Sequence, residues 1–244
     1  MKEYLHAFAM CQSMFCAIPC PFQVWDEDAR PKMLLFLPVV GLEIGILWWL
    51  LATAASLLNL PDLVCGLVIA LWPFLATGKL HLDGFMDVTD AVGSCRSLEK
   101  RREILKDSHV GAFAVIGVGM LLLAQFVFGA SIDSGLRVLI FVPVISRCGS
   151  ALAVTLLKPM GTSQYARQKI HKGHAVLLLI MLAAALAAGF LICGKPAFAL
   201  LGGTAGYLLA LRKGYRSLEG MNGDISGYAL TCSELCALAV LACL

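Results

Sequence analysis

Long apolar runs, separated by short polar segments, divide the 244 residues of this chain. The runs cover about residues 33–58, 62–77, 112–130, 136–157, 175–193, 196–211 and 228–244. A helix that spans a bilayer needs about 20 mostly apolar residues, because its backbone groups must pair within the segment. None of the runs alternates apolar with polar residues, as the strands of a membrane barrel do. The pattern therefore predicts an all-α fold, a polytopic integral membrane helical bundle with about seven transmembrane helices.

The N-terminal segment predicts a different kind of helix. Residues 4–18 mix aromatic, methionine and small residues, and Pro19 and Pro21 follow. This composition is typical of a helix that lies in the membrane interface. The segment lacks the basic start and the small-residue cleavage site of a signal peptide. No repeat or long linker divides the rest of the chain, so we expect a single membrane domain over residues 1–244.

Composition narrows the class of protein further. Apolar residues make up 59% of the chain, charged residues 14%, and the mean hydropathy is +0.83. Soluble domains carry about 25% charged residues, and disordered chains are far less apolar, so both classes are excluded. The net charge of +3 is too small for a nucleic-acid-binding face. The ten cysteines include no CxxC pair, and we interpret them as packing residues rather than disulfides.

Lysine and arginine residues gather in alternate connecting segments. Segments 1–32, 78–111, 158–174 and 212–227 hold 16 of the 19 lysine and arginine residues. Cytoplasmic loops of membrane proteins carry such an excess of positive charge. We therefore expect the N-terminus and these four segments at the cytoplasmic side of a lipid bilayer.

Three aspartates follow the second apolar run at the spacing of one helix face. Asp83, Asp87 and Asp90 lie four and three residues apart, and no lysine or arginine shares their stripe. Carboxylates placed this way repel one another, and Mg²⁺ binds a few carboxylates together with substrate phosphates. The stripe therefore predicts a site for Mg²⁺ and a phosphate ester, with a solvated acidic face as the alternative. Gly84 allows a ligand or another backbone to approach the stripe closely.

Two further polar segments could contribute to the same site. Asp107 is an additional candidate metal ligand, and Lys106 comes directly before it. Residues 98–106 predict a basic amphipathic helix at the membrane surface, with simple topology-setting charge as the alternative. Asp224 follows an Asn-Gly turn that contains Gly223, and we expect it in a cytoplasmic loop.

Basic residues elsewhere could bind the phosphates of a substrate. Arg147 lies within the fourth apolar run and needs either a buried acidic partner or a substrate. Tyr165 and Arg167 lie in a predicted cytoplasmic loop, and arginine recognises phosphate through paired hydrogen bonds. Together these residues indicate a membrane enzyme that handles a phosphate or pyrophosphate ester.

Motifs along the whole chain resemble the adenosylcobinamide-GDP ribazoletransferases, also called cobalamin synthases. The strongest match is HLDGFMDVTDA at residues 81–91, followed by KDSHVGAFAVI at residues 106–116. Weaker matches are IPCPF at 18–22, PVVGLEIG at 38–45, the ISR that ends at Arg147, YAR at 165–167, NGDISG at 222–227 and SEL at 233–235. Lys79 departs from the family pattern, in which a glycine usually stands before the first motif.

The resemblance implies a Mg²⁺-dependent enzyme of the bacterial inner membrane, with its active site on the cytoplasmic side. It joins adenosylcobinamide-GDP to α-ribazole, or to α-ribazole 5′-phosphate, and releases GMP. Glycine-rich helix faces also permit a homodimer or larger homo-oligomer. The implied metal ligands are Asp83, Asp87, Asp90, Asp107 and Asp224. The expected catalytic residues are Asp87, Asp90 and Lys106. The expected substrate-binding residues are His81, Gly84, Arg147, Tyr165, Arg167 and Gly223.

Two other functions fit parts of the pattern. CDP-alcohol phosphotransferases also place aspartates and an Asp-Gly pair on a membrane helix. In their motif Ala-Arg follows this pair, whereas here Asp83-Gly84 is followed by Phe-Met-Asp. A transporter could use Glu43, Arg147 and Glu234, which lie at membrane depth. Transporters often show inverted repeats, however, and the aspartates of this chain gather at one surface.

Overall fold

The computed structural model describes residues 2–161 and 172–244, and the regular elements in these ranges are helical. The α-helices are α1 (Lys2–Phe15), α2 (Leu37–Leu57), α3 (Asp62–Ala76), α4 (Leu80–Gly93), α5 (Leu98–Ile104), α6 (Ala112–Ala130), α7 (Val142–Leu156), α8 (Lys172–Cys193), α9 (Phe198–Leu218) and α10 (Gly223–Ala242). Short 3₁₀ helices lead into α2, α7 and α9, namely η1 (Arg30–Phe36), η2 (Leu136–Ile140) and η3 (Lys195–Ala197). The predicted all-α fold is confirmed.

The helices also confirm a polytopic membrane protein, with fewer spans than the sequence predicts. Five described segments are long and apolar enough to cross a membrane, namely α2 with η1, α6, α7 with η2, α8 and α10. Helices α3 and α4 would make a sixth span if they are counted together. The prediction of about seven spans counted α3 and α9 as separate crossings. Helix α3 has only 15 residues, and the last turns of α9 carry Arg212, Lys213 and Arg216.

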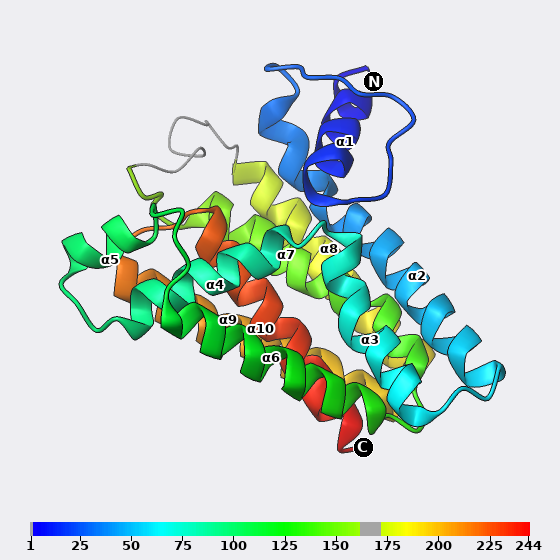
Figure 1. Ribbon diagram of the computed structural model, residues 1–244. Coiled ribbons are helices and arrows are strands. Elements are labelled where there is room, and N and C mark those ends of the chain that lie inside the picture. The colour runs from blue at the N-terminus through cyan, green and yellow to red at the C-terminus, as the bar shows by residue number, and fades with distance from the viewer. Residues whose placement is uncertain (1, 162–171) are drawn as a thin grey trace.

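Helices α7 and α10 form the centre of the bundle. In their apolar stretches 72% and 61% of the residues are buried, compared with 22% in α6 and 17% in α8. The peripheral helices present apolar side chains such as Leu123 and Leu191 outward, as contact with lipid requires. Figure 1 shows α1, α5 and the start of α10 at the end of the bundle that lies opposite the C-terminus. All ten cysteines are free thiols; eight are at least partly buried, whereas Cys95 and Cys243 are exposed and do not serve as packing residues.

A sharp turn between α3 and α4 changes the direction of the chain by 91°. Gly78 and Lys79 both adopt the left-handed backbone conformation there, with φ of 58° and 68°. Glycine adopts this conformation freely, whereas a residue with a side chain loses about 1–2 kcal/mol. A glycine at position 79 would therefore suit this backbone better than the lysine. Because of the turn, α4 does not continue the direction of α3 and carries its aspartates across the bundle.

The predicted N-terminal helix is present as α1. One face of α1 is buried, including Cys11 and Phe15, and it packs against η1 and α2. The backbone amide of Ala17 donates a hydrogen bond of 2.8 Å to the carbonyl oxygen of Ala76, at the end of α3. Helix α1 therefore covers the same end of the bundle at which α4 begins.

Candidate functional site

Four aspartates from two helices form an acidic cluster, defined here as Asp83, Asp87, Asp90 and Asp224. The first three lie on α4, and Asp224 lies in the first turn of α10. The charges of the other three all act on the Asp87 carboxylate. None of the ion pairs among the described residues involves a member of the cluster. The predicted stripe on α4 is thus joined by the aspartate of the NGD motif and lacks a neutralising side chain within the described chain.

Close contact between α4 and α10 brings these carboxylates together. A Cβ atom at Gly84 would lie 2.9 Å from the Cα atom of Asp224, so only glycine allows this approach. A Cβ atom at Gly227 would lie 3.1 Å from the carbonyl oxygen of His81, which is also a tight approach. The hydroxyl of Thr231 donates a hydrogen bond of 3.3 Å to the carbonyl oxygen of His81. Of the two roles that the sequence allowed for Gly84, the structure shows the approach of another backbone.

Asp224 is held by the start of α10. The side chain of Asn222 accepts a hydrogen bond of 3.0 Å from the amide of Ile225 and so caps the helix. The amide nitrogen of the same side chain donates a hydrogen bond of 2.6 Å to the Asp224 carboxylate. Helix α10 therefore begins at Gly223, whereas the sequence predicted a loop up to residue 227. Gly223 has open space beside it, where a ligand could approach.

Asp90 has a second role at the start of α6. Its carboxylate lies against Gly111, where a Cβ atom would collide with it, and it accepts a 3.4 Å hydrogen bond from the amide of Ala114. A helix N-terminus presents unpaired amides and a partial positive charge, which stabilise a carboxylate. Asp90 therefore fixes the start of α6 beside the cluster and is partly occupied by that contact.

Repulsion within the cluster affects the pKa of Asp87. Helix α4 has 14 residues, begins after the 91° turn and is not among the five single-segment spans. Partial burial, and then the charges of Asp83, Asp224 and Asp90, raise the pKa of Asp87 to about 6. A raised carboxylate pKa means that a further negative charge is unfavourable at this position. A bound cation would reverse this effect.

The geometry of the cluster suits a cation that is only partly held by protein. Within the described residues no three His, Cys, Asp or Glu side chains are close enough to hold one metal ion among them. Mg²⁺ usually keeps several waters and is bound through one or two carboxylates plus substrate phosphates. The charge and oxygen ligands of the cluster fit this mode of binding and do not form a closed metal cage.

No hydrogen bond or ion pair among the described residues joins Lys106 or Asp107 to the acidic cluster. Lys106 and Asp107 are on the exposed segment after α5, and Asp107 accepts a 3.0 Å hydrogen bond from the amide of His109. The hydrogen bond to the His109 side chain, and then the bond to its backbone amide, lower the pKa of Asp107. Tyr165 and Arg167 lie outside the described residues.

Arg147 has the buried acidic partner that the sequence allowed as one of two alternatives. Its guanidinium donates a hydrogen bond of 2.7 Å to Glu234 of α10, and both side chains are buried. The same nitrogen contacts the hydroxyl of Ser146 at 3.2 Å. This pair joins the two central helices, α7 and α10. The sequence placed both residues at membrane depth, but only the fold shows that they meet.

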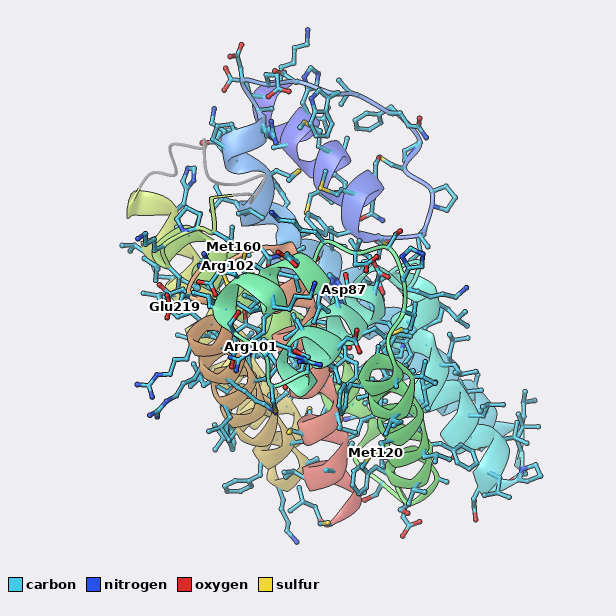
Figure 2. The ribbon with its side chains drawn as sticks, turned by 60° about the vertical axis from the view of Figure 1, so that its left-hand side comes forward. Asp87, Arg101, Arg102, Met120, Met160 and Glu219 are labelled. Carbon is cyan, nitrogen blue, oxygen red and sulfur yellow. The ribbon has the colours of Figure 1, made fainter. Side chains whose placement is uncertain are left out.

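The basic helix α5 also has a structural partner. Arg102 donates hydrogen bonds of 3.0 Å to the carbonyl oxygens of Leu218 and Glu219, and Arg101 donates one of 3.2 Å to Ser217 (Figure 2). These carbonyls end α9 and have no partner within their own helix. Two arginines of α5 therefore bind the C-terminus of α9, a use that neither sequence alternative foresaw.

A cavity of about 130 Å³ borders the acidic cluster. Asp83 and Asp224 line it together with His81, whose side chain is 7% exposed. The Nε2 atom of His81 has no hydrogen-bond partner among the described residues. Further lining residues were not predicted from the sequence, namely Phe15, Leu34, Leu37, Leu80, Ser150, Val154 and Ser226. They come from separate segments, and of these seven only Ser226 lies within a motif quoted from the sequence.

Known proteins resemble this chain over almost its whole length. An adenosylcobinamide-GDP ribazoletransferase of Clostridium perfringens (strain SM101) is 38% identical over 251 residues, which is 99% of each chain. A protein of the same name from Clostridium botulinum (strain Alaska E43) is 34% identical, over 98% of this chain and 97% of the relative. One from Brevibacillus brevis (strain 47) is 33% identical, over 99% and 98%. No solved structure matches this chain at a significant level.

A family profile agrees with these relatives. Residues 7–242 match the family described as cobalamin-5-phosphate synthase, a range that contains the acidic cluster and its cavity. The predicted resemblance is therefore confirmed, and the chain belongs to the cobalamin-5-phosphate synthase family.

Proposed function

We propose that this chain is an adenosylcobinamide-GDP ribazoletransferase whose acidic cluster is the active site. It joins adenosylcobinamide-GDP to α-ribazole, or to α-ribazole 5′-phosphate, and releases GMP. The observation that carries the proposal is the cluster itself, in a chain 38% identical to a ribazoletransferase along its length. The four carboxylates repel one another and have no neutralising side chain among the described residues, so their placement does not serve packing alone. It suits a cation bound to a pyrophosphate.

The reaction exchanges a phosphoanhydride bond for a phosphoester bond. The 3′-hydroxyl oxygen of α-ribazole forms a bond to the phosphorus that stays on the cobinamide, while the bond from this phosphorus to the GMP oxygen breaks. GMP leaves with the bonding electron pair, in line with the attacking oxygen. A carboxylate of the cluster accepts the hydroxyl proton as general base. Asp90 is the least free of the four for this role, because it also binds the start of α6.

The proposed cofactor is Mg²⁺, which one or two of the carboxylates of Asp83, Asp87 and Asp224 would hold together with the substrate pyrophosphate. When bound, Mg²⁺ supplies positive charge to the pyrophosphate and to the oxygen of the leaving GMP. The Asn222 side chain orients Asp224 for this role through their 2.6 Å hydrogen bond. Lys106, on the exposed segment after α5, remains our candidate for neutralising an outer phosphate. Arg147 is already matched by Glu234, so we assign it to joining α7 and α10.

The first test is turnover by membranes that contain the protein. We expect GMP and adenosylcobalamin to appear in equal amounts from adenosylcobinamide-GDP, α-ribazole and Mg²⁺, and EDTA to stop both. Asp87→Asn should abolish turnover, while Asp133→Asn, at an exposed aspartate of the α6–η2 connection, should leave it unchanged. Normal turnover by Asp87→Asn would rule out the proposed site. Absence of product from folded wild-type protein, also with the 5′-phosphate substrate, would rule out the reaction.

We also propose that the acidic cluster faces the cytoplasm. Cys95 is exposed just after α4, and Cys243 is exposed near the C-terminus at the opposite end of the bundle. In intact cells a membrane-impermeant maleimide should modify Cys243 and leave Cys95 unmodified until the cells are lysed. Peptide mass spectrometry reads out both sites in one sample. The reverse labelling would place the cluster on the outer side and contradict the proposal.

A further inference from the structure

The cavity beside the acidic cluster has features of a binding site for part of a substrate. We propose that it receives the dimethyl-substituted ring of the base of the acceptor nucleoside, α-ribazole. The proposal rests on the transfer reaction proposed above and assigns one of its two substrates to a place in the protein. It also gives α1 a role, because Phe15 contributes to the wall.

One side of the cavity is apolar. Leu34 and Leu37 approach from η1 and α2, Leu80 from α4 and Val154 from α7. The base of α-ribazole is a dimethylbenzimidazole, two fused rings with two methyl groups and one free ring nitrogen. Guanine, the base of the other substrate, carries several donors and acceptors that would lose their water partners against such a wall. The apolar side therefore favours the base of the acceptor.

Aromatic and hydroxyl side chains complete the lining. The buried imidazole of His81 lies nearly parallel to the ring of Phe15, at 12° and with 6.4 Å between the ring centroids. The hydroxyls of Ser150 and Ser226, which hydrogen-bond to each other, also line the cavity.

The size of the cavity limits what can enter it. A cavity of 150 Å³ in another protein holds one benzene molecule, so about 130 Å³ accommodates roughly one aromatic ring. The dimethyl-substituted ring of the base meets this limit, whereas a corrinoid or a whole nucleotide does not. With this ring inserted, the ribose lies beside Asp83 and Asp224, which line the same cavity and belong to the cluster. Ribose hydroxyls donate hydrogen bonds to carboxylates, so this arrangement brings the attacking hydroxyl to the proposed site of phosphoryl transfer.

A cavity-filling variant tests the assignment. Val154→Phe places a ring in the cavity, and Leu156→Phe adds a ring at an exposed position of the same helix as the matched control. Two quantities are measured on purified protein, namely the Kd of α-ribazole in EDTA without donor, and the KM of each substrate with Mg²⁺. We expect Val154→Phe to raise the Kd and KM of α-ribazole at least about tenfold, equivalent to about 1.4 kcal/mol. The KM of adenosylcobinamide-GDP should stay within about twofold, and Leu156→Phe should match wild type.

A second variant keeps the test valid if Val154→Phe does not fold. Leu34→Ala enlarges the cavity, and we expect it to shift the preference for ribosides toward bulkier bases by at least about threefold in kcat/KM. An unchanged preference would overturn the assignment.

The two proposals can fail separately. If wild-type protein binds α-ribazole and Val154→Phe does not, the cavity assignment holds even where no cobalamin is formed. If Val154→Phe raises the KM of the donor alone, the cavity holds guanosine and the assignment is wrong. If folded Val154→Phe matches wild type in the binding of both substrates, the cavity binds neither base and the assignment is also wrong.

Discussion

Neutralising Asp87 should stabilise the metal-free protein while removing its activity. Asp87 lies among three other carboxylates, and these charges together with partial burial raise its pKa from 3.8 to about 6. The folded state therefore holds this proton more tightly than the unfolded chain does. As the pH rises from about 4 to about 6, the metal-free protein loses stability, and it does not regain it at higher pH.

The size of this loss follows from the shift in pKa. One pKa unit corresponds to about 1.4 kcal/mol, so a rise from 3.8 to about 6 amounts to at most about 3 kcal/mol. Solvent screens a half-buried carboxylate, which brings our expectation to about 1–3 kcal/mol. Asp87→Asn keeps the shape of the side chain and removes its charge. It should therefore raise the free energy of unfolding near pH 8 by this amount and flatten the dependence on pH.

The assay is unfolding of detergent-solubilised protein, followed by circular dichroism as SDS is increased. Wild type, Asp87→Asn and the Asp133→Asn control are compared in EDTA near pH 5 and near pH 8, and again with Mg²⁺. Mg²⁺ should stabilise wild type near pH 8 and have little effect on Asp87→Asn. If metal-free Asp87→Asn is less stable than wild type near pH 8, the repulsion inferred from the cluster does not exist.

Three further variants test the packing around the site. Glu234→Gln leaves the buried charge of Arg147 unpaired and should lower the free energy of unfolding by about 3–5 kcal/mol. The double variant with Arg147→Met and Glu234→Leu should recover most of this stability. Loss of turnover in a stable double variant would show that Arg147 also serves the reaction. Gly84→Ala forces α4 away from α10 and should lower the free energy of unfolding by about 1–3 kcal/mol, with a fall in kcat. Gly119 has open space beside it, so Gly119→Ala should behave as wild type. Equal effects of the two variants would refute the close approach. Arg102→Gln removes two hydrogen bonds to the end of α9 and should lower the free energy of unfolding by about 1–3 kcal/mol, measured by the same SDS unfolding. An unchanged midpoint would show that these hydrogen bonds contribute nothing to stability.

Local patterns predicted the helices and the acidic stripe well. The apolar runs located the spans, and the spacing of Asp83, Asp87 and Asp90 placed them together on α4 because helix periodicity is a local property. The start of α10 was predicted five residues late, although Asn222 is a standard N-cap residue. Apolarity alone marks where a helix enters hydrocarbon, and helices continue beyond that point into the polar layer.

Contacts between distant segments could not be predicted in the same way. Arg147 and Glu234 are 87 residues apart, and the sequence contains several candidates for each side of such a pair. The arginines of α5 are 116 or 117 residues from the carbonyls that they bind. Phe15 reaches the cavity only because α1 folds back over the start of α4. These contacts depend on the path of the whole chain, which neither periodicity nor composition determines.

The short length of α3 has a consequence for how the enzyme depends on its bilayer. Fifteen helical residues extend about 23 Å, whereas the hydrocarbon core of a typical bilayer is about 30 Å thick. If Asp62 begins α3 at one surface, the turn at Gly78 and Lys79 ends it several ångströms below the other. Local thinning of the bilayer beside α3 is one way to accommodate this difference, and it would keep the carboxylates of α4 in contact with water. Reconstitution into lipids of increasing chain length should bury this edge progressively, so the turnover rate should decline with membrane thickness while the helices remain intact.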